Sequence, residues 1–109
     1  MAETIKVLGQ VAPSATALTV LYTVPSSTEA VVSTIAICNR SSSKITVRVS
    51  VAVGGATDSP EQYIMYDVDV ESYGYLLATI GLTLAATDVV RVYASSGDAS
   101  FSLFGTEIT

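Results

Sequence analysis

The sequence predicts a single all-β domain, an antiparallel β-sandwich of about eight strands. Three observations predict this class. Apolar residues recur at every second position, β-branched residues dominate the apolar runs, and turn residues separate the runs at intervals of about 8–12 residues. The chain has 109 residues, the length of one domain. We therefore expect one sandwich domain over residues 1–109.

The clearest predicted strand runs from Lys44 to Val53. Its apolar face is expected to carry Ile45, Val47, Val49, Val51 and Val53. Its other face would carry Lys44, Thr46, Arg48, Ser50 and Ala52. Such alternation is typical of a strand with one face in the core and one in a polar setting. The β-branched run also disfavours a helix.

The same reasoning predicts the remaining strands, which span Thr4–Val11, Leu18–Val24, Ala30–Cys38, Gln62–Val70, Tyr75–Leu84, Asp88–Ala94 and Ser100–Ile108. In the strand that ends at Val70, alternation places Tyr66 and Val68 on one face. It places Met65 and Asp67 on the other.

The connections between the strands leave the topology open. Asn39–Ser43 is typical of a hairpin loop, Gly54–Pro60 is the longest flexible stretch, and Leu82–Asp88 is the one place suited to a short helical turn. Eight strands fit a jelly roll and an immunoglobulin-like Greek key equally well. The chain lacks tryptophan, so the core tryptophan that marks immunoglobulin domains is missing.

Composition excludes several classes of function. Five Lys and Arg against ten Asp and Glu give a net charge of −5, which argues against binding to nucleic acid or to an anionic membrane surface. No apolar run approaches the ~20 residues of a membrane span. The chain has no histidine and one cysteine, Cys38, so we expect no catalytic site, no metal site and no cofactor. Cys38 ends an apolar strand and is expected to be a small buried residue.

The surface composition points to contact with other proteins. Only 14% of residues are charged, against roughly 25% in an average soluble domain. The chain has 14 serines and 13 threonines instead. A hydroxyl-rich, charge-poor surface is expected either for an extracellular protein or for one covered largely by partner chains.

Two groups of residues are candidates for such an interface. Asp67, Asp69 and Glu71 are spaced to project from one strand face, where they would either face solvent or meet basic residues of a partner. A calcium site is disfavoured because no calcium-loop consensus is present. The second group is a cluster of tyrosines, which suit an interface and a sandwich core about equally. Its members are Tyr63, Tyr66, Tyr73 and Tyr75.

The run Leu21–Pro25 (LYTVP), followed by Ala30–Arg40 (AVVSTIAICNR), resembles small virion proteins of tailed bacteriophages. Tyr63–Val68 (YIMYDV), Gly81–Tyr93 (GLTLAATDVVRVY) and Phe101–Ile108 (FSLFGTEI) fit the same pattern. The resemblance covers most of the chain and rests on strand ends and turns. It implies a β-sandwich that decorates or cements a capsid, or that belongs to the tail, neck or fibres. It supplies no catalytic residue.

The leading expectation is a capsid decoration or cement protein, made in the host cytoplasm and located in the virion. It would be a homo-oligomer, a trimer if it decorates a shell, and would bind other virion proteins such as the major capsid protein. Residues 1–10 could extend as an arm onto a neighbouring subunit. The alternative is a tail, neck or fibre component, including a receptor- or glycan-binding module that uses the tyrosines as its aromatic platform.

Overall fold

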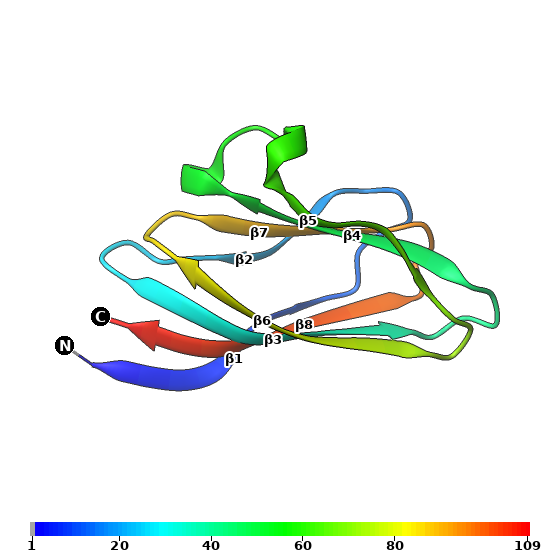
Figure 1. The fold of residues 1–109 in the computed structure, drawn as a ribbon, viewed down its shortest axis with the longest axis horizontal. Helices are drawn as coiled ribbons and strands as arrows, with labels where there is room; N and C mark the ends of the chain where they lie inside the picture. Colours follow the sequence, from blue (N-terminus) through cyan, green and yellow to red (C-terminus); the bar gives the residue numbers. More distant parts are fainter. Residues whose placement is uncertain (1) are drawn as a thin grey trace.

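The computed structural model describes residues 2–109, which form two four-stranded antiparallel sheets packed face to face (Figure 1). This confirms the predicted all-β sandwich. Eight strands build the sheets: β1 (Glu3–Val11), β2 (Thr19–Thr23), β3 (Glu29–Asn39), β4 (Ile45–Ala52), β5 (Tyr63–Val70), β6 (Tyr75–Leu84), β7 (Val89–Ala94) and β8 (Ala99–Ile108). Within residues 2–109, no helix is long and apolar enough to cross a membrane.

The core lies between the sheets and is filled by alternating side chains from both. On β4, Ile45, Val47 and Val49 are buried, while Thr46 and Arg48 point away from the core. Each buried side chain of this size contributes about 1.5–3 kcal/mol by leaving water, so such rows drive the sheets together. The facing sheet contributes Ile35, Ile37, Phe101 and Leu103.

The strand order is that of a jelly roll. One sheet is ordered β1-β8-β3-β6 and the other β2-β7-β4-β5. The chain therefore pairs β1 with β8, β2 with β7, β3 with β6 and β4 with β5, all antiparallel. These are the pairings of one long antiparallel hairpin rolled into two sheets of four strands, which is the jelly-roll arrangement. The connectivity decides between the two topologies that the sequence left open.

The loop after β3 crosses between the sheets. The sequence suggested a hairpin here, but β3 and β4 belong to different sheets, and only β4 and β5 are consecutive strands of one sheet. The buried Asn39 holds this crossing. Its amide donates to the carbonyl oxygens of Ser43, Val70 and Glu71 at 2.8, 3.2 and 3.0 Å. Its Oδ1 accepts a 2.9 Å bond from the backbone N–H of Ser41.

The short helical turns lie between β4 and β5, not in residues 82–88 as expected. They are the 3₁₀ turns η1 (Val53–Gly55) and η2 (Pro60–Gln62). Residues 82–88 finish β6 and turn into β7, where the carboxylate of Asp88 accepts a 2.9 Å bond from the backbone N–H of Ala85. This local bond closes the turn without a helix.

Val53 is 76% exposed, so its predicted place on the core face is wrong. β4 ends at Ala52 because the chain leaves the sheet in η1, where Gly54 takes a φ of +64°. The last two outward residues of β4, Ser50 and Ala52, are fully buried although they face away from the core. The segment 53–62 folds back over this sheet, and its turns η1 and η2 contact β7 and β4 (Figure 1).

β1 is an edge strand held by its own chain through β8. Its register shifts around Leu8, a β-bulge that leaves Leu8 buried and Ile5 and Val7 on the outer face. The chain ends meet beside it, where Ala2 and Thr109 exchange two backbone hydrogen bonds of 2.8 Å (Figure 1). Contact between residues 1–10 and a neighbouring subunit stays a prediction. Met1 lies outside the described residues.

Candidate functional site

The residues predicted as one interface lie on two opposite faces of the sandwich. Tyr63 and Tyr66 belong to β5 and lie on the outer face of the β2-β7-β4-β5 sheet. Tyr75 begins β6 and points outward from the other sheet, and Tyr73 sits in the turn between these strands. The four tyrosines therefore do not form one surface.

A β-bulge on β5 changes the predicted alternation. Two residues, Tyr66 and Asp67, lie opposite the single residue Arg48 of β4, and Asp67 takes a φ of +52°. The extra residue reverses the pattern along the strand. As a result Met65 and Val68 both pack against the core, and the prediction that placed them on opposite faces is wrong.

Two of the three acidic residues, Asp67 and Asp69, pair with basic residues of the same chain. Asp67 accepts hydrogen bonds from Arg48, and Asp69 lies 3.7 Å from the Nζ of Lys44. Both members of the second pair are more than half exposed, so it contributes little to stability. Glu71 lies beyond the end of β5, where its carbonyl oxygen accepts bonds from the backbone N–H of Gly74 and from the side-chain amide of Asn39.

Arg48 is held between two aromatic rings. Its guanidinium carbon lies 4.2 Å from the ring centre of Tyr66 and 4.3 Å from that of Tyr93. Its Nε and Nη2 donate to the two carboxylate oxygens of Asp67 at 2.6 and 3.3 Å. The bond to Asp67 is the main cause that raises the pKa of Arg48. The side chain is thus fixed in direction by stacking and by a forked ion pair.

The segment 53–62 forms a wall beside this cluster. Arg91 donates from its guanidinium to the carbonyl oxygens of Ala56 and Gly55 at 2.8 and 3.2 Å. Asp88 accepts a 2.8 Å bond from the backbone N–H of Gly54. Because β7 supplies Arg91 and lies next to Asp88, the wall is tied to the sheet beneath it.

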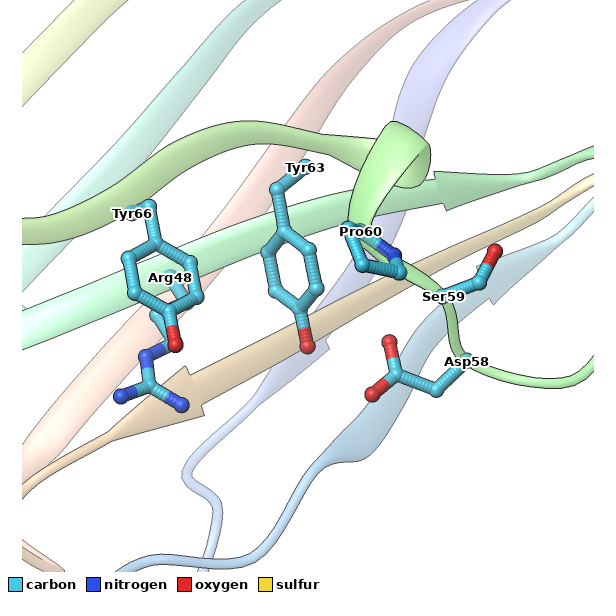
Figure 2. Close-up of a pocket in the computed structure, with 6 residues that line it drawn as sticks. All are labelled: Arg48, Asp58, Ser59, Pro60, Tyr63 and Tyr66. Atoms are coloured by element: carbon cyan, nitrogen blue, oxygen red, sulfur yellow. The ribbon is translucent and has the colours of Figure 1, made fainter.

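Together these elements border an open surface pocket of about 610 Å³, within the usual size range of small-molecule sites (Figure 2). Its lining consists of Arg48, Asp58, Ser59, Pro60, Tyr63 and Tyr66. The rings of Tyr63 and Tyr66 meet edge to face, 5.1 Å apart at an interplanar angle of 88°. Their hydroxyls point the same way, that of Tyr63 toward the carboxylate of Asp58 (Figure 2).

Neighbouring groups shift the pKa values of two polar residues in and beside the pocket, Tyr63 and Glu61. Burial raises the pKa of Tyr63, and the Asp58 carboxylate raises it further. The hydroxyl of Ser59 donates a hydrogen bond to the carboxylate of Glu61. This bond lowers the pKa of Glu61 and links the residue before η2 to the first turn of η2. Asp58 takes part in no salt bridge within residues 2–109. Sequence reasoning identified the two tyrosines but missed Arg48 and the Asp58–Pro60 wall.

The outer face of the β1-β8-β3-β6 sheet, here called the open face, mixes exposed apolar side chains with serine and threonine hydroxyls. Between its ends, its outward residues on all four strands are uncharged. Charged side chains stand only at the two ends, with Glu3 and Glu29 at one and Arg40 at the other. Its exposed large apolar residues are Ile5 (87%), Val7, Val31, Tyr75 (72%) and Leu77 (62%).

Cys38 lies on the open face and is exposed, so the prediction of a buried residue is wrong. The physical reason is strand alternation: Ile37 and Asn39 on either side point into the core, which turns Cys38 outward. It pairs across the sheet with Tyr75 and Ser100. Within residues 2–109, no group of three or more Cys, Asp or Glu is placed to hold a metal ion.

No protein-family profile matches this sequence. No curated protein matches it either.

Proposed function

We propose that this protein is a virion structural protein that decorates or cements a capsid shell, and that it binds a neighbouring protein chain of the shell through the open face. The observation that carries the proposal is the contrast between the two outer faces. One is charged and partly covered by segment 53–62, whereas the other is uncharged between its ends, exposes large apolar side chains among its hydroxyls, and is uncovered by residues 2–109.

Exposed large apolar side chains on a face without charges are unfavourable in water and are typical of a protein interface. Ile5, Tyr75 and Leu77 each expose more than half of their side-chain surface there. The depletion of charge matches the centre of interfaces, where charged residues are scarce and aromatic residues are enriched. A chain that binds only the assembled shell stabilises it by mass action.

The fold and the edge strands add support. Jelly rolls occur widely in viral capsid proteins, although a fold alone does not determine function. β1 is an edge strand whose outer backbone groups are not paired by β8, so it offers a site for strand addition by a neighbouring copy. This is the contact expected for residues 1–10 in a homo-oligomer.

Two measurements test the proposal on purified phage particles. Quantitative mass spectrometry counts the copies: a decoration protein is present in hundreds, and a handful would place it in the tail, neck or fibres instead. Maleimide labelling then tests the face, because Cys38 is the only cysteine and is exposed in the free chain. Cys38 should react in the free protein and be protected on the particle. Equal labelling in both states would contradict docking through the open face.

A further inference from the structure

The pocket formed by β4, β5 and the segment 53–62 lies on the face opposite the open face and takes no part in the docking proposed above. It is preformed, because its wall is tied to the sheet by the bonds of Arg91 and Asp88. Its aromatic side chains are also fixed, with Tyr66 packed between Arg48 and Tyr63. A preformed site loses little entropy on binding, which favours recognition of a small ligand.

The charges in the pocket select the class of ligand. The guanidinium of Arg48 already occupies the cation–π position against the Tyr66 ring, so a cationic ligand finds no free ring face for such a contact there. Asp58 is a carboxylate without a salt bridge in the described chain, and it would repel an anionic ligand. The positive charge of Arg48 is already matched by Asp67. A neutral ligand is therefore favoured.

The hydrogen-bonding groups of the pocket further restrict the class of ligand that it can bind. Asp58 accepts hydrogen bonds only, whereas Arg48 has N–H groups beyond the two that it donates to Asp67. The tyrosine hydroxyls both donate and accept. Acceptors and donors thus surround an aromatic surface, which suits a ligand with hydroxyls on its rim and an apolar C–H face. A hexopyranose ring has both.

We propose that this pocket binds a neutral sugar unit of a glycan. The C–H face of the sugar packs against the tyrosine rings, and its hydroxyls bond to Asp58 and Arg48. Tyr66 supplies the main aromatic contact through the part of its ring that Arg48 and Tyr63 leave uncovered, since the residue is 58% exposed. In a particle docked through the open face, this pocket would point away from the shell. Binding by the free chain does not depend on that orientation.

Saturation-transfer NMR on the purified full chain tests the proposal. The probes are methyl glycosides of glucose, galactose, mannose and N-acetylglucosamine, with choline and inorganic phosphate as charged comparisons. Tyrosine fluorescence gives an independent signal, since the chain has no tryptophan. At least one neutral glycoside should bind saturably in the millimolar range, and choline and phosphate should not. Failure of all four glycosides, or preferential binding of choline or phosphate, would overturn the proposal.

Three variants locate the binding. Tyr66→Ala and Asp58→Asn should each weaken binding on the order of tenfold, the size expected for loss of one aromatic contact or one charge-assisted bond. Tyr75→Ala is the matched control, because Tyr75 is also an exposed tyrosine but lies on the open face. If the circular-dichroism spectrum shows that Tyr66→Ala does not fold, Asp58→Asn still tests the binding site, because Asp58 lies in the surface segment 53–62. Equal binding by Asp58→Asn and the parent chain would contradict the site.

Discussion

Arg48 and Asp67 meet because a β-bulge places Asp67 directly opposite Arg48: the Nε of Arg48 donates to Oδ1 of Asp67 at 2.6 Å. A regular strand would set one residue of β5 against Arg48, whereas the bulge sets two, Tyr66 and Asp67. The same guanidinium therefore stacks on Tyr66 and binds Asp67. This local irregularity builds one side of the pocket.

Because of the bulge, substitution by valine is expected to lower the free energy of unfolding more at Asp67 than at Asp69. Asp67 has a φ of +52°, a conformation that costs a β-branched residue more than Asp or Asn. Asp67→Val should lower the free energy of unfolding by about 1–2 kcal/mol, and Asp67→Asn much less. Asp69→Val, at an exposed strand position with ordinary backbone, should change it by less than about 0.5 kcal/mol. Urea unfolding followed by circular dichroism measures all three; equal losses at 67 and 69 would show that the bulge is misplaced.

Because β4 ends at Ala52, substitution by Asp should have very different effects on folding at Val49 and at Val53. Val49 is fully buried, so Val49→Asp places an unpaired charge in the core at a cost of several kcal/mol and should abolish folding. Val53 follows the strand and is 76% exposed, so Val53→Asp should leave the protein folded. Circular dichroism and thermal melting of the two variants provide the comparison. A folded, soluble Val49→Asp protein would mean that the faces of β4 are assigned wrongly.

The hydrogen bond between Tyr22 and Glu107 is expected to stabilise the fold only within a limited pH range. The hydroxyl of Tyr22 donates to Glu107 and is the main cause that lowers the pKa of Glu107 below its usual 4.5. A lowered carboxyl pKa stabilises the fold above about pH 4.5, and this stability is lost as the pH falls through the lowered value. Burial, and then Glu107, raise the pKa of Tyr22 above 10. A raised phenol pKa means that the stability is present below pH 10 and is lost at higher pH.

Thermal melting across pH tests this window by comparing the parent chain with Tyr22→Phe. The parent should be the more stable of the two, with the largest difference between about pH 5 and pH 10. The difference in stability should shrink at lower pH, where Glu107 is protonated, and at higher pH, where the Tyr22 hydroxyl is deprotonated. The hydrogen bond requires a charged Glu107 and a neutral Tyr22. A difference that stays constant from pH 3 to pH 11 would show that Tyr22 acts through packing alone.

The sequence predicted the strands well because their signal is local. Alternation in β4 predicted its core face correctly from Ile45 to Val51, although Val51 is only partly buried. It failed on β5, where the bulge at Asp67 reverses the pattern, and it placed Val53 in a strand that had already ended. Alternation also carries no information on which strands pair, so it cannot distinguish the crossing after Asn39 from a hairpin.

The candidate site was harder to predict, because it joins residues that are distant in the chain. Tyr63 and Tyr66 stood out by composition, whereas Arg48 looked like one more polar residue of β4. Its role follows from pairing with β5 across the bulge. Asp58 lay in a stretch predicted to be flexible, and only the bonds of Arg91 to this stretch make it a wall. Such contacts leave no periodic signal in the sequence.

Docking through the open face is tested most directly by a charge placed on one of its exposed apolar residues. Leu77 is 62% exposed on β6 and Val20 is 51% exposed on the outer face of the other sheet, so both Leu77→Glu and Val20→Glu should fold. The decisive measurement is co-sedimentation of each purified variant with phage particles stripped of this protein. We expect Val20→Glu to bind like the parent chain and Leu77→Glu to stay in the supernatant, because the new carboxylate would be buried without a partner. Full binding by a folded Leu77→Glu variant would contradict the account.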